Sequence, residues 1–147
     1  MLTLPTRSQF PRWIAIGCGV GVFFWLRLED NGVLVPVLAG LALTLVLAGW
    51  WLTRWLGGRA YTPRWVIVGA LVVGAIIGLG TAIMTALLML LKNGLHGHIF
   101  PDFPFGVILE ILQRGPAWAL AGALIGGGIA LAWAALRTTA VNTSTSN

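Results

Sequence analysis

Four long apolar runs, each free of charged residues, constrain the fold of this chain more than any other feature. They are Trp13–Leu26, Gly32–Leu52, Trp65–Leu91 and Pro116–Leu136. Because an α-helix rises about 1.5 Å per residue, about 20 apolar residues cross a hydrocarbon core of about 30 Å. The first run is the shortest, and it spans a bilayer only if Arg12 and Arg27 snorkel or the bilayer thins locally. The runs therefore predict an all-α integral membrane protein with four transmembrane helices.

The composition supports a membrane protein and excludes a water-soluble globule. Of the 147 residues, 9 % are charged and 58 % are apolar, whereas a soluble domain carries about a quarter charged residues. The net charge of +5 does not indicate nucleic-acid binding, because the nine basic residues are scattered singly between apolar runs. The single cysteine, Cys18, excludes an internal disulfide and a cysteine-cluster metal site.

Lysine and arginine residues predict the orientation of the spans, because the cytoplasmic loops of membrane proteins carry the larger share of them. One side of the membrane receives Arg7, Arg12, Arg54, Arg59, Arg64 and Arg137. The other side receives only Arg27, Lys92 and Arg114. We therefore expect a multi-pass protein of the cell (inner) membrane with both termini in the cytoplasm.

Tryptophan residues fall near the ends of the predicted spans. Indole prefers the headgroup region of a bilayer, because its ring is apolar and its N–H needs a hydrogen-bond partner. The expected interface anchors are Trp13, Trp25, Trp50, Trp51, Trp65, Trp118 and Trp133. Their positions support the boundaries given to the four runs.

A repeated motif opens the first and third spans: PRWIAIG at Pro11–Gly17 returns as PRWVIVG at Pro63–Gly69. In the second and fourth spans, Leu38-Ala39-Gly40 aligns with Leu120-Ala121-Gly122. Duplication of one helical hairpin in parallel topology explains these matches. Convergence explains them too, because proline, arginine and tryptophan each suit the start of such a span.

The chain divides on this basis into two hairpins with short flanking segments. They are a cytoplasmic N-terminal segment 1–12, a first transmembrane hairpin 13–62, a second hairpin 63–137 and a disordered polar tail 138–147. The second hairpin is the longer one, because residues 93–115 add an outer loop and a short amphipathic helix. Duplication predicts that the hairpins superpose about an axis close to the membrane normal.

Pairs of glycines four residues apart occur in three spans and predict close helix packing. They are Gly17 and Gly21, Gly74 and Gly78, and Gly122 and Gly126. Lipid gives helices no hydrophobic drive to associate, so close backbone approach and dispersion must hold them together. We expect the four glycines of the third and fourth spans to face other helices rather than lipid.

The loop after the third span contains the only two histidines, His96 and His98, with Asp102 four residues further on. Two imidazoles and a carboxylate are suitable ligands for a divalent metal. The alternative is a packed surface loop in which the histidines bond to backbone groups or water. Upstream of the loop, Asn93-Gly94 predicts the end of the third span.

The residues after this loop predict a short amphipathic helix, Phe103–Arg114. Asp102 precedes it as a candidate N-cap, and Glu110 and Arg114 are spaced for an i,i+4 ion pair. We expect this helix to lie along the outer interface or to cap the bundle.

No motif of a catalytic site occurs in the sequence: there is no glycine-rich phosphate loop, no serine elbow and no HExxH. The four runs also lack ionisable residues, which coupled transporters usually need within the membrane. The polar residues well inside the runs are Thr44, Thr81 and Thr85, and we expect each to bond to its own helix backbone.

These observations favour a non-enzymatic accessory or scaffold subunit that packs against other membrane proteins, without a cofactor and without nucleic acid. The alternative is a small-solute or ion transporter or channel that works as an oligomer, with its pathway between subunits. A third possibility is a metal-binding membrane protein that uses His96, His98 and Asp102.

Overall fold

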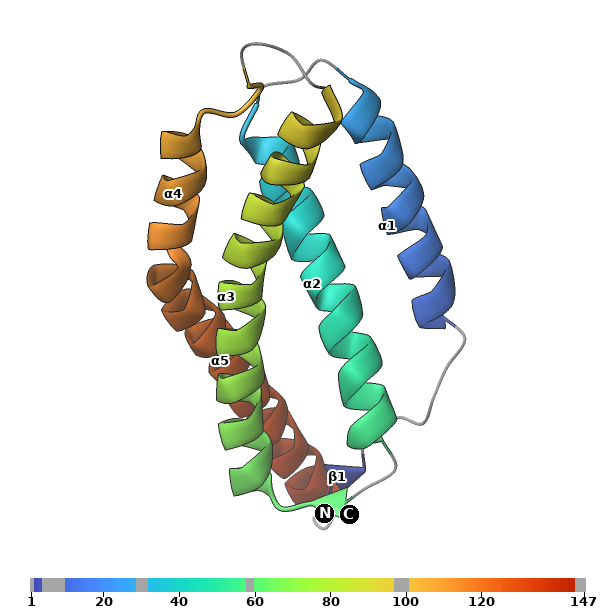
Figure 1. Ribbon diagram of the computed structural model, residues 1–147. Helices are drawn as coiled ribbons and strands as arrows, with labels where there is room; N and C mark the ends of the chain where they lie inside the picture. The colour runs from blue at the N-terminus through green and yellow to red at the C-terminus, as the bar shows by residue number, and fades with distance from the viewer. Residues whose placement is uncertain (1, 4–9, 29–31, 58–59, 97–100, 145–147) are drawn as a thin grey trace.

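The computed structural model, which describes residues 2–3, 10–28, 32–57, 60–96 and 101–144, is a helical bundle (Figure 1). Within these residues the helices are α1 (Phe10–Arg27), α2 (Leu34–Trp55), α3 (Pro63–His96), α4 (Phe105–Gln113) and α5 (Gly115–Ser144). Two short strands, β1 (Leu2–Thr3) and β2 (Ala60–Tyr61), pair antiparallel. This pairing, which the sequence analysis did not predict, joins the N-terminal residues to the connection between α2 and α3.

Three helices contain segments that are long and apolar enough to cross a membrane. Among the described residues, these segments are Leu34–Trp55, Arg64–Leu95 and Gly115–Leu136. The all-helical membrane class is therefore confirmed, with candidates for the second, third and fourth expected spans. α1 is not one of them, because its 18 residues include Arg12 and Arg27, which lower its hydropathy.

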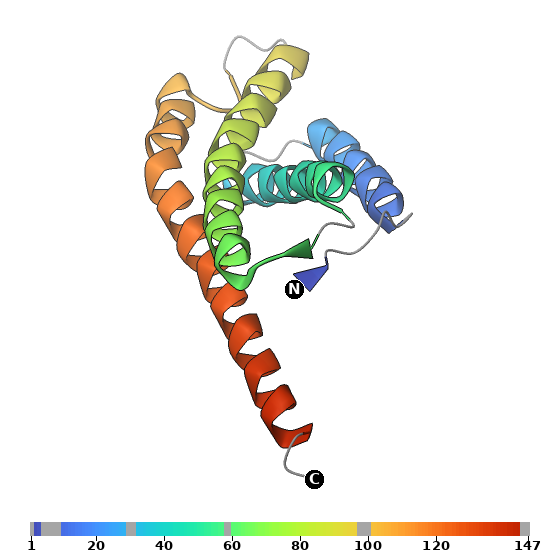
Figure 2. The same ribbon diagram turned by 90° about the horizontal axis from the view of Figure 1, so that it is seen from below.

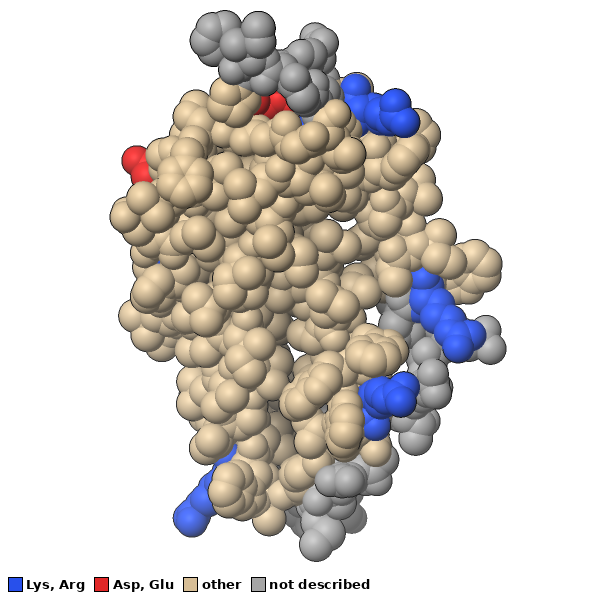
Figure 3. Space-filling model, viewed as in Figure 1, with Lys and Arg blue, Asp and Glu red and all other residues tan. Residues whose placement is uncertain are grey.

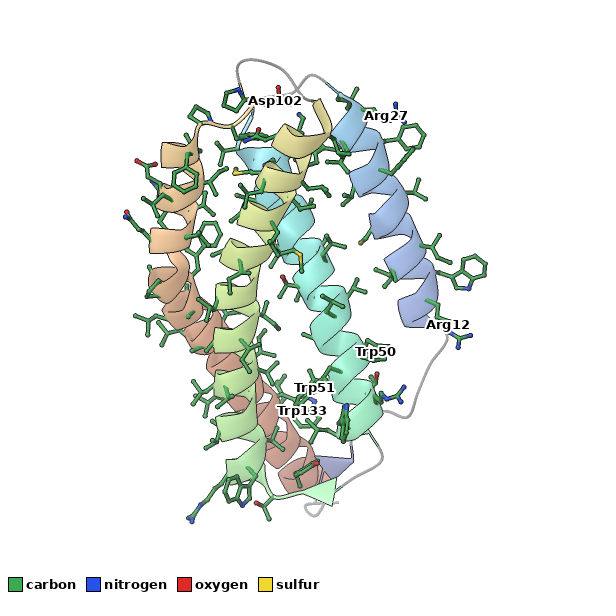
Figure 4. The ribbon with its side chains drawn as sticks, in the orientation of Figure 1. Arg12, Arg27, Trp50, Trp51, Asp102 and Trp133 are labelled. Carbon is green, nitrogen blue, oxygen red and sulfur yellow. The ribbon has the colours of Figure 1, made fainter. Side chains whose placement is uncertain are left out.

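Helix α3 is the centre of the bundle: α2 and α5 both pack on it, and α1 packs on α2. α1 and α3 run in one direction, and α2 and α5 run in the other (Figure 1). α5 crosses α3 and extends beyond the other helices at its C-terminal end (Figure 2). Figure 4 shows Arg27 and Asp102 at one end of the bundle, which we call the outer end after the expected orientation, and Arg12 and Trp50 toward the opposite, inner end.

Glycines bring α3 and α5 into backbone contact. A Cβ added at Gly78 would overlap the carbonyl group of Trp118, and one added at Gly74 would overlap the carbonyl group of Gly122. One added at Gly126 would likewise overlap the carbonyl oxygen of Ala70. Only glycine allows two helix backbones to come this close. These contacts fix the register of α5 along α3.

Small residues and threonines bring α2 against the opposite side of α3. A Cβ added at Gly40 would lie 2.9 Å from the backbone nitrogen of Thr85, and one added at Gly80 would lie 2.8 Å from a methyl group of Thr44. The Thr44 hydroxyl donates to the Gly40 carbonyl at 2.8 Å, and the Thr85 hydroxyl donates to the Thr81 carbonyl at 2.7 Å. The Thr81 hydroxyl does the same to the Ile77 carbonyl at 2.8 Å. The expected bonding of all three threonines to their own helices is confirmed.

Gly17 and Gly21 differ from these contact glycines. An added Cβ at either residue would meet nothing within 4 Å, so neither packs against another helix of the described chain. α1 is held at a distance by larger side chains, and Val22 and Leu26 pack instead against the core cluster. The prediction of close packing through this pair is therefore wrong within one chain. It also follows that the two hairpins pack differently, whatever the origin of their similar sequences.

Two helix ends differ from the sequence prediction. α3 continues through Asn93-Gly94 to His96, because the Asn93 side chain is engaged by a segment that is distant in sequence. α5 continues through Ser144, so residues 138–144 are helical where a disordered tail is expected. No glycine or proline follows Arg137 in that segment, so nothing in the local sequence stops the helix.

Helix α4 leads directly into α5, with only Arg114 between them. The N–H of Arg114 donates to the carbonyl of Glu110 (N···O 3.1 Å), and the N–H of Trp118 donates to the carbonyl of Arg114 (3.0 Å). Pro116 has no N–H to continue this ladder, which accounts for the bend between the two helices. α4 therefore lies beside α3 and above α5, and it does not cap the helix ends (Figure 1).

The two predicted polar features of α4 have different outcomes. Pro104, and not Asp102, is the N-cap residue, and no side chain caps the helix. Asp102 is too far from the first turn because α4 begins only at Phe105. The i,i+4 ion pair is confirmed, with Arg114 Nη2 3.9 Å from Glu110 Oε2. Both side chains are exposed, so in water the pair would add little to stability.

The hydrophobic core lies mainly toward the outer end. Its buried residues come from α1, α3, α4 and the segment before α4. They are Trp25, Ala82, Ala86, Leu88, Met89, Phe103, Ile108 and Ile111. Toward the inner end fewer apolar side chains are buried, one of them Ala130 of α5. The outer end is thus the part of the bundle in which a single chain packs most completely.

Candidate functional site at the outer end

Lys92 lies near the C-terminal end of α3, and its side chain is fully buried (0 % exposed). Lysine is almost never buried completely unless partners compensate for the lost hydration. Two aromatic rings face its ammonium group: Nζ lies 4.8 Å from the ring centroid of Trp25 and 5.6 Å from that of Phe103. Both distances are within the range of attractive cation–π interactions, which strengthen when water is excluded.

The two rings are held by residues from separate parts of the chain. Trp25 comes from α1 and is 4 % exposed, and Phe103 precedes α4 and is 1 % exposed. Their ring centroids are 6.4 Å apart. We call Trp25, Lys92 and Phe103 the cation cluster. It ties α1, α3 and the segment before α4 together at the outer end.

Asn93 fixes the position of Phe103 through both of its side-chain polar atoms. Asn93 Nδ2 donates to the carbonyl of Phe103 at 2.8 Å, and the N–H of Phe103 donates to Asn93 Oδ1 at 2.9 Å. These two hydrogen bonds resemble those between paired strands, and together they leave the Asn93 side chain and the Phe103 backbone little freedom to rotate. The residue expected to end the third span therefore anchors the segment that leads into α4.

The residues of the predicted metal site are only partly described. His98 lies outside the described residues, and His96 is described only as the last residue of α3. Asp102 lies at the outer end with its Oδ2 atom buried, next to Phe103 of the cation cluster (Figure 4). Within the described part of the chain, no group of three histidine, cysteine or acidic residues could hold a metal. The metal site stays a prediction.

The tryptophans expected at the membrane interface fall into two groups. Trp50, Trp51 and Trp133 lie in the inner half of the molecule (Figure 4) and are 49 %, 49 % and 37 % exposed. Trp13 and Trp65 are also exposed, as an interface anchor requires. Trp25 is instead a core residue, and its Nε1 is buried with no hydrogen-bond partner in the described structure. Trp118 packs against the core cluster and touches Gly78, midway along α3.

Among the described residues, three apolar grooves lie between the helices. The largest of these three has a volume of about 430 Å³ and runs between α2 and α5 over α3, where Leu41, Ile77 and Ile125 line it. The second, of about 380 Å³, lies between the inner halves of α2 and α3, beside Trp51. The third, of about 310 Å³, lies between α1 and α2, beside Cys18. No charged side chain lines any of the three.

Comparisons with known protein families, with curated proteins and with solved structures find no match to this chain. The class is therefore established by the fold alone, as a helical membrane protein with three long apolar candidate spans. The cation cluster and Asn93 lie together at one end of the bundle. The arrangement joins helices; it contains no nucleophile–base pair among the described residues.

Proposed function

We propose that this protein is a non-enzymatic accessory or scaffold subunit that packs against other proteins of the cell membrane. In this proposal α2, α3 and α5 cross the bilayer, α1 makes a fourth, short crossing, and both termini lie in the cytoplasm. Arg12 and Arg27 of α1 would reach the two headgroup regions by snorkelling. The similar motifs at Pro11 and Pro63 would then open the two crossings of an internal duplication.

The observation that supports this function most is the chemistry of the grooves. All three are apolar, and the threonine hydroxyls that line them, those of Thr44 and Thr81, bond to their own helices. A solute pathway needs polar or ionisable groups that replace water around its cargo. The groove between α2 and α5 lacks such groups, but it offers open apolar surface over the glycines of α3. Such a surface suits a neighbouring transmembrane helix.

The test is purification of the protein from its native membrane in mild detergent, followed by identification of whatever co-purifies. We expect a stoichiometric partner, and we expect Ala121→Phe to reduce its recovery several-fold, because Ala121 lines the groove between α2 and α5. Leu124→Phe is the matched control, since Leu124 is on the same helix, is 65 % exposed and does not line the groove.

A lone homo-oligomer with no second protein would contradict the accessory role and would favour a transporter whose pathway forms between subunits. Equal recovery of the partner with Ala121→Phe and Leu124→Phe would keep the accessory role but would place the docking surface elsewhere.

A further inference from the structure

Contacts along α3 show the relative heights of α2 and α5. Thr44, in the middle of α2, touches Gly80 of α3. Trp118, three residues into α5, touches Gly78, only two positions away on the same helix. The middle of α2 is therefore level with the start of α5. It follows that α5 does not lie beside the outer half of α2, so in a membrane α5 would not cross the outer leaflet.

Helix α4 occupies that place instead. Ile108 and Ile111 of α4 are 2 % and 4 % exposed and pack in one cluster with Ala82, Ala86 and Met89, which belong to the outer half of α3. At the other end of α4, Gly115 lies against Leu79 and Ala82. If α2 crosses the bilayer, α4 therefore lies within the hydrocarbon of the outer leaflet. The last crossing of the chain then consists of α4 together with the first half of α5.

This depth gives Glu110 and Arg114 an unusual environment. Their side chains are 68 % and 63 % exposed, so they point away from the bundle. Arg114 is nine residues beyond Phe105, the first residue of α4, or about 14 Å along the helix axis, which brings it toward the middle of a bilayer. On the side of the molecule formed by α4, Figure 3 shows one acidic side chain below the outer end and then uncharged surface as far as a basic side chain at the inner end. A charged pair that faces lipid at this depth is costly, and such residues normally face protein.

We propose that this face of α4 is the contact surface between two copies of the chain. This inference rests on the membrane placement given under the proposed function and goes beyond it by naming the partner. In a dimer with its two-fold axis along the membrane normal, the two α4 helices are parallel and their charges lie at equal depths. Because Glu110 and Arg114 are one helical turn apart, Glu110 of each copy reaches Arg114 of the other diagonally, and each copy brings one negative and one positive charge to the contact.

The neighbouring residues suit a second copy as well. Gly106 lies one turn before Glu110, and a Cβ added there would meet nothing within 4 Å, so a second helix can approach closely. Leu109, three residues after Gly106, shares this face and is 45 % exposed, and Phe105, which is 72 % exposed, borders it. The charged residues determine the partner and the register of the two α4 helices, and the apolar residues supply the contact area.

Trans-complementation tests the dimer directly, by fluorescence energy transfer between labelled chains in lipid bilayers at increasing lipid dilution. Glu110→Arg puts two positive charges on the face, and Arg114→Glu puts two negative charges on it. We expect each variant alone to dimerise at least about tenfold more weakly than the parent. Mixing the two variants should restore association, but only between unlike chains. Helical circular dichroism equal to that of the parent shows that both variants are folded.

A larger side chain on the same face of α4 tests the dimer a second time, without a change of charge. Gly106→Leu should weaken the dimer about tenfold or more, whereas Gly128→Leu on α5, where an added Cβ also meets nothing, should leave it unchanged. A monomeric parent, or charge variants that associate as the parent does, would overturn the proposed contact. A monomeric parent that still co-purifies with another protein would overturn the dimer and leave the accessory function in place.

Discussion

Replacing Gly78 by alanine is expected to destabilise the protein by about 2 kcal/mol, although alanine is the better helix former. The added methyl group would overlap the carbonyl group of Trp118, so α3 and α5 would have to separate along their whole contact. The clash is with backbone, which cannot move aside as a flexible side chain can. The free energy of unfolding, measured by denaturant titration in one fixed lipid–detergent mixture, gives the effect.

Gly69→Ala is the matched control, because Gly69 is on the same helix and an added Cβ meets nothing within 4 Å there. It should be neutral or stabilising by up to about 1 kcal/mol, the helix-propensity difference between the two residues. Gly78→Ala is thus expected to lower the stability, whereas Gly69→Ala is not. If Gly78→Ala were as stable as Gly69→Ala, the close contact of α3 and α5 would be absent from the protein in a membrane.

The second large effect is expected for Trp25→Ala, with a loss of about 3 kcal/mol or more, the usual result of removing a buried aromatic side chain. Among the residues of α1 whose burial is described, Trp25 is the buried one, and it provides the closer ring to the Lys92 ammonium. Without it, α1 keeps only its contacts with α2 and a few partly buried side chains. We therefore expect α1 to detach while α3 and α5 remain packed.

Hydrogen exchange of the α1 amides in bicelles measures this detachment segment by segment. Protection in α1 should fall strongly in Trp25→Ala, whereas protection in α3 and α5 should be retained. Trp13→Ala is the control, because Trp13 is on the same helix and is 73 % exposed. Lys92→Met should give a smaller loss of protection in the same segment, since it removes the cation but keeps most of the side-chain volume. Unchanged exchange in Trp25→Ala would show that the cation cluster does not hold α1.

The parts of the fold that the sequence predicts well depend on local properties. The runs that begin at Gly32, Trp65 and Pro116 are long and apolar, and length and hydropathy alone make them candidate spans. The bonding of Thr44, Thr81 and Thr85 is also local, because a threonine within an apolar helix finds its nearest acceptor one turn earlier. The ion pair of α4 follows from helical spacing in the same way.

The cation cluster depends on contacts between distant segments, and the sequence does not predict it. Lys92 directly follows the third apolar run, and its position there indicates only the end of a span. Its burial requires Trp25 from α1 and Phe103 from the far side of the outer loop. A single available signal was Asn93, whose amide is suited to hold a backbone segment. The residue type and position of Trp25, a tryptophan near the end of a span, suggested an interface anchor. It is a core residue because α1 is rotated about its axis so that Trp25 faces the other helices.

The position of α4 also depends on a distant contact. Its charged pair suggests a helix at the membrane surface, whereas its depth follows from the glycine contacts that set α5 against α3. Sequence spacing shows which residues share a face of a helix, but not how far one helix is shifted along another. The offset between α2 and α5 is such a shift, and it places α4 beside the outer half of α3.

The placement of the chain in the membrane is central to the proposed function and to the proposed dimer, and one labelling profile tests it most directly. Single cysteines at Thr62, Gly94, Leu38 and Leu109, in a Cys18→Ser background, are treated with an impermeant thiol reagent in intact cells. All four residues are exposed on the isolated chain, so protection from the reagent reports the membrane or a partner and not the fold.

We expect Gly94→Cys to react from outside, because this residue lies at the outer end of α3, and Thr62→Cys to react only after the cells are permeabilised. Leu38→Cys on α2 and Leu109→Cys on α4 should both stay unlabelled, because they lie at similar heights within the hydrocarbon. Reaction of Thr62→Cys but not of Gly94→Cys in intact cells would show that the orientation is the opposite of the expected one. Reaction of Leu109→Cys as fast as Gly94→Cys would place α4 in water and contradict the membrane placement on which the dimer rests.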